Sequence, residues 1–178
     1  MYSDQEKRQV LQLIDNTRDS LLAATVGLSE AQANFKPSQE SWSVAEIVEH
    51  LAIVEDRVIG RVSQLLESSP AMQDGKVEDS DALLIAKVMD RSTKFRAPDF
   101  IQPAGEPLAD SFERLTAGRG KLVDLLNSAP PDFRERSMPH PVLGPLDAHQ
   151  WLIALAGHCG RHTQQIVETK SAANFPAN

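Results

Sequence analysis

The sequence has almost none of the features that cross-link a chain covalently or anchor it in a membrane. A single cysteine, Cys159, among 178 residues excludes an internal disulfide framework and is typical of a reducing compartment. No apolar run approaches the roughly 20 residues that a membrane-spanning helix needs. The N-terminal residues lack the apolar core of a signal peptide. We therefore expect a cytoplasmic protein without a membrane segment.

Clusters of positive charge are also missing. The chain has 18 Lys and Arg residues against 25 Asp and Glu, which gives a formal net charge of -7 at pH 7. Proteins that bind nucleic acid usually present a basic surface, because phosphate contacts dominate their affinity. We therefore expect no nucleic-acid partner, and anionic membrane surfaces are unfavourable partners for the same reason.

Aromatic residues make up only 5% of the chain. Residues that favour helices, such as Ala, Leu, Glu and Gln, are plentiful, so helix is expected rather than sheet. A chain of this length can bury one hydrophobic core large enough to be stable without disulfides. We expect one domain over residues 1–178, with residues 171–178 as a frayed tail.

Four segments carry apolar residues at three- and four-residue steps, the period of an amphipathic helix. They cover residues 4–28, 43–67, 108–127 and 147–170, and a shorter helix is expected over 80–91. Ser43 and Glu46 form a capping-box pattern after Trp42, and Asp147 with Gln150 is a similar helix start.

The connections between these helices differ in length. Residues 29–41 and the Pro/Arg-rich segment 130–145 are expected to be linkers, and residues 68–75 are rich in turn formers. Residues 95–107 contain three prolines and are expected to be extended. Together these features predict an all-α, up-down-type four-helix bundle with a long crossover between its second and third main helices.

The sharpest local motif is His158-Cys-Gly-Arg-His162. Four-residue spacing on a helix places two imidazoles on one face, about 6 Å apart between Cβ atoms, which suits chelation of one metal ion. Zinc proteases with such a helix need a glutamate directly after the first histidine, and here that position is Cys159. The motif therefore indicates a metal site and excludes this protease chemistry.

A firm site needs a third ligand, and three other histidines are available. His149 is more than two turns before His158, too far to share an ion easily, and His140 lies in a proline-flanked loop. His50 is the best candidate, because it lies on the core stripe of another long helix. Three imidazoles would leave a position open for water. The alternative is that these histidines are ordinary hydrogen-bonded core residues without an ion.

The other chemical candidates have plainer interpretations. Cys159 is expected to point away from the ion and to pack as a small buried hydrophobe. Arg119 either binds a substrate anion or, as we expect, pairs with a buried acid such as Glu46 or Glu49. The helical period places Glu49 and Asp56 off the core face, where they are expected to be solvated.

Three further residues are expected to serve packing. His140 is interpreted as a packing residue of its loop or as a residue that supports a ligand. Trp42 and Trp151 are expected to be staple and core residues.

Two segments resemble the DinB/YfiT-like superfamily of metal-dependent enzymes. A Trp-Ser helix start followed by a His-Leu pair is matched by Trp42, Ser43, His50 and Leu51. The family's last helix carries His-x-x-x-His and then Gln-Ile, matched by His158, His162, Gln165 and Ile166. Its preceding His-Pro-x-x-Gly-Pro loop is matched by His140, Pro141, Gly144 and Pro145.

The resemblance implies a four-helix bundle in which His50, His158 and His162 hold one divalent ion, commonly zinc or nickel, and often a homodimer. Members of the family include S-transferases that use small thiols such as bacillithiol or mycothiol. We therefore expect a metal-dependent enzyme that activates a low-molecular-weight thiol, or water, for attack on a small electrophilic substrate. The alternatives are a metal-dependent hydrolase of another substrate and a non-catalytic, stress-related protein that binds metal or a small ligand.

Overall fold

The computed structural model describes residues 1–67, 80–92, 96–130 and 132–177. Its four long helices are α1 (Asp4–Thr25), α3 (Val44–Glu67), α5 (Leu108–Asn127) and α6 (Ala148–Lys170). The shorter elements are α2 (Glu30–Ala33), α4 (Asp81–Met89), the 3-10 turns η1 (Asp99–Ile101) and η2 (Phe133–Glu135), and the strands β1 (Ser137–His140) and β2 (Gly144–Asp147). The predicted all-α four-helix bundle is confirmed, and the two-stranded hairpin is a small addition to it.

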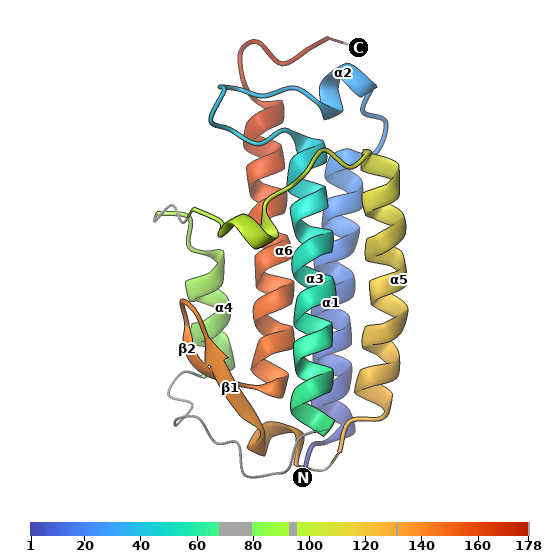
Figure 1. The fold of residues 1–178 in the computed structure, drawn as a ribbon, viewed down its shortest axis with the longest axis vertical. Helices are drawn as coiled ribbons and strands as arrows, with labels where there is room; N and C mark the ends of the chain where they lie inside the picture. Colours follow the sequence, from blue (N-terminus) through green and yellow to red (C-terminus); the bar gives the residue numbers. More distant parts are fainter. Residues whose placement is uncertain (68–79, 93–95, 131, 178) are drawn as a thin grey trace.

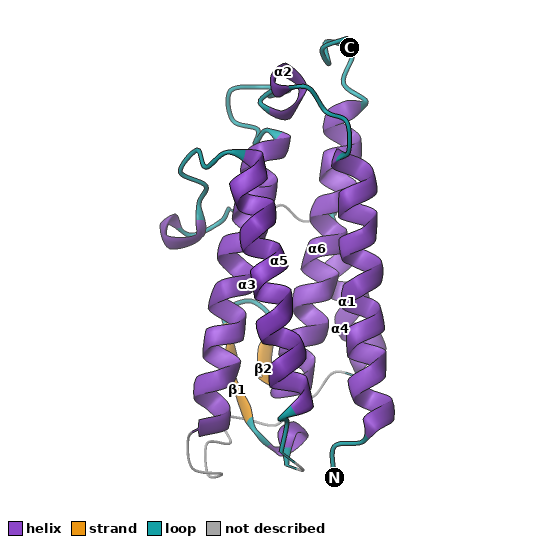
Figure 2. Cartoon of the chain, turned by 90° about the vertical axis from the view of Figure 1, so that its right-hand side faces the viewer, coloured by secondary structure: helices purple, strands orange, loops and turns teal. Residues whose placement is uncertain are grey.

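The long helices lie side by side along the long axis of the molecule (Figures 1 and 2). Following the colours of Figure 1, α1 and α6 run in one direction and α3 and α5 in the other. The crossover explains this order: the chain returns along the bundle through α4 and residues 96–107, so that α5 starts at the same end as α3. The segment after α4 consequently passes over the outer face of α3 and α6.

The helix starts follow their predicted caps. Ser43 Oγ accepts the backbone N–H of Glu46 (3.2 Å), and the Glu46 carboxylate accepts the N–H of Ser43 (2.8 Å), which is a complete capping box. Asp147 accepts the N–H of Gln150 (2.7 Å) and starts α6. These caps fix where α3 and α6 begin, and thus the positions of their histidines along the axis of the bundle.

The core fills the space between the long helices. At the end that carries the histidines it consists of fully or nearly fully buried apolar side chains, namely Leu21, Val44, Ile47, Val48, Leu51, Ala52, Leu115 and Ile166. Burying an Ile or Leu side chain contributes about 1.5–3 kcal/mol. Ile47 and Leu51 flank His50 on α3, so hydrophobic burial holds that ligand candidate in place.

The structure corrects three local predictions. The first helix ends at Thr25 rather than Leu28, because Gly27 takes a left-handed φ of 75°. The linker at 29–41 contains the short helix α2, capped by Ser29. The segment 130–145, expected to be a plain link, forms η2 and most of the hairpin, with Ser137 paired to Asp147 and His140 to Gly144.

The C-terminal tail is packed, in contrast to the frayed end that we expected. The ring of Phe175 meets that of Phe35 edge to face at 5.4 Å, and Gln32 Nε2 donates to the carbonyl of Pro176. The tail therefore covers α2 at the end of the bundle.

Two remaining predictions concern other parts of the chain. The turn-rich segment 68–75 lies outside the described residues. Among the helices that the structure describes, none is long and apolar enough to cross a membrane.

Candidate metal centre

His50, His158 and His162 come together between α3 and α6. The Nε2 atom of His158 lies 3.2 Å from that of His50 and 3.1 Å from that of His162. One ring nitrogen of each histidine lies within 4.8 Å of the others. His50 is 2% exposed, and the other two rings are partly buried. The three side chains singled out from the sequence therefore point at one position.

Hydrogen bonds on the far side of two rings set their tautomers. His50 Nδ1 donates to the carbonyl oxygen of Ile101 (2.8 Å), and His162 Nδ1 donates to Gln165 Oε1 (2.9 Å). A neutral imidazole carries one proton, so the Nε2 atoms of both rings keep their lone pairs for the centre. His158 Nδ1 is buried and has no hydrogen-bond partner among the described residues.

The environment keeps the three imidazoles neutral. Burial lowers the pKa of His50, while its bond to Ile101 opposes this. Burial lowers the pKa of His158 far below its ordinary value, and the neighbouring imidazoles add to that effect. Burial, followed by His50, lowers the pKa of His162 to about 3. Neutral imidazole is the form that binds metal, so no proton needs to be displaced at pH 7.

The geometry fits a divalent ion. Zinc–nitrogen bonds of about 2.0–2.1 Å in tetrahedral geometry place two ligand nitrogens about 3.3–3.4 Å apart. Two of the three Nε2 separations, 3.1 and 3.2 Å, are close to that value, and the three ring nitrogens all lie within 4.8 Å of one another. Lone pairs that face one another at this distance repel unless a cation or a shared proton lies between them. A three-imidazole donor set could hold zinc, nickel, copper or iron.

Trp42 forms a wall of this centre. Its ring lies 4.8 Å from the ring of His50 and 6.3 Å from that of His162. Trp42 directly precedes the cap residue Ser43 and packs against the core at that end of the bundle. The predicted staple residue therefore also shields the imidazoles from water.

The crossover forms a strap over α3, and the buried carboxylate of Glu49 holds it. Residues 96–107 are called the strap below. Glu49 is 3% exposed and accepts three backbone N–H groups, from Ala104 (2.7 Å), Gly105 (2.9 Å) and Glu106 (2.9 Å). Gly105 has a φ of 97°, a conformation that favours glycine. The strap is thus fastened to two successive residues, Glu49 and His50.

Our expectation that Glu49 is solvated was therefore wrong. Glu49 lies off the apolar stripe of α3, as the helical period indicated, but the strap covers that side of the helix. Asp56 is 38% exposed and pairs with Arg114 at 3.0 Å, which fits the solvated interpretation better.

Arg119 does not pair with either acid suggested from the sequence. Its Nη2 donates to the carbonyl of Ile14 (3.2 Å), and its Nε lies 4.0 Å from the carboxylate of Asp15. Burial lowers the pKa of Arg119, whereas the charge of buried Glu55 raises it. The acids that face it are therefore Glu55 and Asp15.

Cys159 and His140 have packing roles. Cys159 Sγ lies 3.6 Å from the carbonyl of Thr17, and burial raises the pKa of the thiol to about 11, so it is unreactive at pH 7. His140 Nδ1 accepts the backbone N–H groups of Val142 and Leu143 (both 3.2 Å), and its ring lies 4.8 Å from that of Trp151. His140 thus closes the hairpin and does not join the three histidines.

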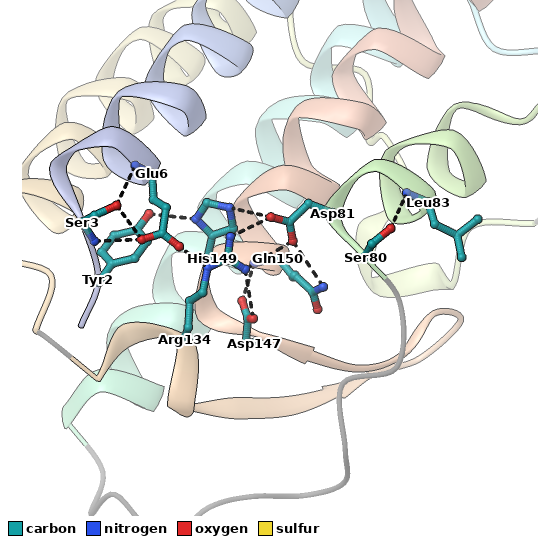
Figure 3. Close-up of polar contacts among 10 residues, drawn as sticks. All are labelled: Tyr2, Ser3, Glu6, Ser80, Asp81, Leu83, Arg134, Asp147, His149 and Gln150. Atoms are coloured by element: carbon teal, nitrogen blue, oxygen red, sulfur yellow. Dashed lines mark hydrogen bonds and ion pairs between the residues drawn. The ribbon is translucent and has the colours of Figure 1, made fainter.

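A second cluster of titratable side chains lies at the other end of α6 (Figure 3). Tyr2 donates to His149 Nδ1 (2.9 Å), and His149 Nε2 lies 3.3 Å from the carboxylate of Asp81. Arg134 binds three carboxylates from three parts of the chain, those of Glu6, Asp81 and Asp147. This cluster joins the start of α4 to the bundle and so anchors the crossover. Of these residues, only the cap role of Asp147 was visible from the sequence.

The sequence of this chain matches the profile of one known protein family. The profile of the DinB superfamily matches residues 13–166, which is most of the chain. The chain belongs to the DinB superfamily. Its histidine-bearing segments of α3 and α6 both lie within the matched region.

One sequence relative of this DinB protein and one solved structure with a similar fold come from Bacillus subtilis. The uncharacterised protein YuaE of strain 168 is 28% identical over 146 residues, which cover 81% of this chain and 86% of YuaE. The solved structure of YfiT is similar with a TM-score of 0.62 and 17% identity, and the match covers 99% of this chain and 92% of YfiT. YfiT is described as a probable metal-dependent hydrolase with an unusual four-helix bundle topology. At this identity the likeness shows the fold.

Proposed function

We propose that this protein is a divalent-metal-dependent enzyme whose ion is held by His50, His158 and His162, and that it hydrolyses a small substrate. One observation carries the proposal: Nε2 atoms from two helices converge while the Nδ1 atoms of His50 and His162 are held by fixed acceptors. Such supporting bonds are typical of metal-binding histidines.

The family context supports this assignment. YfiT, which shares the bundle topology over nearly its whole length, is described as a probable metal-dependent hydrolase. Three protein ligands leave positions open for water and substrate, as in catalytic rather than structural sites. When bound, a divalent ion at such a site lowers the pKa of water to near 7 and polarises carbonyl or phosphoryl oxygens.

The chain's own groups position the centre and exclude water. Trp42 covers two of the imidazoles, and the strap holds the orientation of His50 through Ile101. Among the described residues, no carboxylate or thiol contacts the three rings, and Glu49 faces the strap instead. The nucleophile must therefore come from solvent or from a second substrate.

Transfer of a low-molecular-weight thiol to an electrophile is the second candidate reaction. It is favoured by the same lack of a neighbouring base, because a thiol that loses its proton on binding needs no protein base. Zinc and nickel are our preferred ions for either reaction, since both suit imidazole ligands.

Turnover by protein loaded with zinc or nickel tests the proposal. Carboxylic and phosphoric ester substrates, with and without bacillithiol, mycothiol or glutathione, are compared in loaded protein, chelator-treated protein and His158→Ala. We expect metal-dependent ester hydrolysis that His158→Ala abolishes, whereas His149→Gln, a change at a buried histidine of the same helix, retains it.

Three outcomes are informative. A rate that requires a thiol supports the transferase reaction over hydrolysis. Stoichiometric metal without turnover over the whole panel contradicts an enzyme and favours a metal-binding protein. Equal rates with and without metal contradict the role of the three histidines.

A further inference from the structure

A pair of arginines continues the stripe of α3 on which His50 lies. Arg57 and Arg61 follow His50 by seven and eleven residues, so each lies within about 20° of it around the helix. Along the helix axis they are about 10 and 16 Å from His50. Both side chains are exposed. The face of α3 that begins at the metal centre thus becomes positively charged about two to three turns beyond His50.

Each guanidinium lies over an aromatic ring beside this stripe. Arg57 Cζ lies 4.8 Å from the ring of Phe100, which directly precedes the residue that binds His50. Arg61 Cζ lies 5.4 Å from the ring of Trp151, seven residues before His158 on the antiparallel helix α6. A cation over an aromatic face is attracted to the ring, and its N–H groups can still bind an anion.

Neither arginine has an acidic partner among the described residues, where no carboxylate lies within 4.0 Å of it. The nearby acids have other partners: Asp56 accepts from Arg114, and Asp99 accepts from Gln102. Six other arginines do form ion pairs, namely Arg18, Arg91, Arg114, Arg119, Arg134 and Arg136. Arg57 and Arg61 lie one turn apart, so the two positive charges are close together in a chain with a net charge of -7.

His140 adds a third donor at the same place. Because its Nδ1 accepts two backbone N–H groups, its proton lies on Nε2, which has no hydrogen bond to a described residue. Its ring packs on Trp151, the ring that also stacks with Arg61. Arg57, Arg61 and His140 are called the anion patch below.

We propose that the anion patch binds a carboxylate or phosphate group of the substrate while the reactive bond lies at the three histidines. Arginine forks match the geometry of both anions, and an imidazole N–H supplies a further bond. Because His50 and Arg57 are about 10 Å apart along the axis of α3, a substrate that reaches both must be extended, with its anionic end well separated from its reactive bond. This inference rests on the proposed function, because it names the substrate class of the same centre.

Anion binding to metal-free protein provides the first test, since it needs no catalysis. The side-chain signals of Arg57 and Arg61 are followed by NMR during titration with inorganic phosphate or glutarate at constant ionic strength. We expect saturable shifts, and a dissociation constant about two- to fivefold higher in Arg57→Gln or Arg61→Gln, the range for exposed charge pairs. Arg8→Gln, a change at another exposed arginine, leaves the constant unchanged.

A pair of esters that differ only in a terminal carboxylate tests the link to the metal centre. Arg57→Gln should raise KM for the anionic ester and leave KM for the neutral ester unchanged. Equal KM changes for both esters would overturn the proposal, as would titrations in which neither anion shifts the patch or in which Arg8→Gln has the same effect. If neither ester is turned over, the proposed function fails, and the titration still decides whether the patch binds anions.

Discussion

The orientation of the His162 imidazole on α6 depends on one amide side chain. Gln165 holds His162 through a 2.9 Å hydrogen bond to Nδ1. We expect Gln165→Leu to raise the dissociation constant for zinc about 10- to 100-fold, the usual effect of losing such a supporting bond. Gln164→Leu changes the exposed neighbour on the same helix and should leave metal affinity unchanged. Competition with a chromophoric chelator measures both, and equal affinities in the two variants would contradict this role.

Two glycines of α5 should respond differently to alanine. A Cβ on Gly118 would lie 2.9 Å from the buried Oε1 of Glu55, whereas a Cβ on Gly120 would meet nothing within 4 Å. Gly120→Ala should raise the free energy of unfolding by about 0.5–1 kcal/mol, the difference in helix propensity. The free energy of unfolding of Gly118→Ala should be at least about 0.5 kcal/mol lower than that of Gly120→Ala, because the Glu55 carboxylate must move. Urea denaturation of both variants checks this order, and a larger gain for Gly118→Ala would contradict it.

Individual residues show where the sequence was informative. The i, i+4 spacing of His158 and His162 and the core position of His50 were readable, because helical period alone decides which side chains share a face. Glu49 was misjudged, because its burial comes from the strap, 55 to 57 residues away in sequence. The acids that face Arg119 also depend on how helices pack against one another, which periodicity does not specify.

Among the elements, the strap has the most direct effect on the centre. Glu49→Gln replaces one acceptor oxygen by an NH₂ group and should loosen the bonds to residues 104–106. We expect faster amide hydrogen exchange at residues 104–106. The dissociation constant for zinc should rise about tenfold, because Ile101, whose carbonyl binds His50, is then held less firmly.

Glu46→Gln is the matched control for the strap. The Glu46 carboxylate lies on the same helix, accepts the backbone N–H of the cap residue Ser43 and has no bond to the strap. It should lower the free energy of unfolding by about 1 kcal/mol and leave metal affinity unchanged. If both variants weaken metal binding equally, the effect is general destabilisation and the role given to Glu49 is wrong.

The elements themselves were predictable to different degrees. The long helices were found within a few residues, because each buries a continuous apolar stripe and three have side-chain caps, two of which were recognised from the sequence. The hairpin was missed, since its strands have four residues each and contain prolines, and α2 was missed because it spans a single turn. The direction of α5 was set by the crossover, whose path over α3 and α6 has no local signal.

For the molecule as a whole, buried neutral histidines make stability depend on pH. Burial, followed by Arg134, lowers the pKa of His149 to about 4, and burial, followed by Arg61, lowers that of His140 to about 4. The unfolded chain takes up these protons below about pH 6.5, but the folded protein does so only near pH 4. The stability that these groups contribute is therefore complete above pH 6.5 and is lost as the pH falls to 4.

We expect the free energy of unfolding of metal-free protein to fall by about 3 kcal/mol for each such histidine over this range. His149→Gln should show a shallower decline, together with a lower stability at pH 7 because its bonds to Tyr2 and Asp81 are changed. Urea denaturation between pH 7 and pH 4 measures both. A decline of unchanged slope in the variant would show that His149 is not the group that titrates.

Metal content is the decisive measurement for a site formed by His50, His158 and His162. The chain is purified without a metal-affinity column, analysed for transition metals, stripped, and reloaded with zinc or nickel. We expect one ion per chain, restored on reloading and lost in His50→Ala, His158→Ala or His162→Ala, with His149→Gln unaffected. Metal content far below one per chain that reloading does not raise would contradict a metal centre at these three histidines.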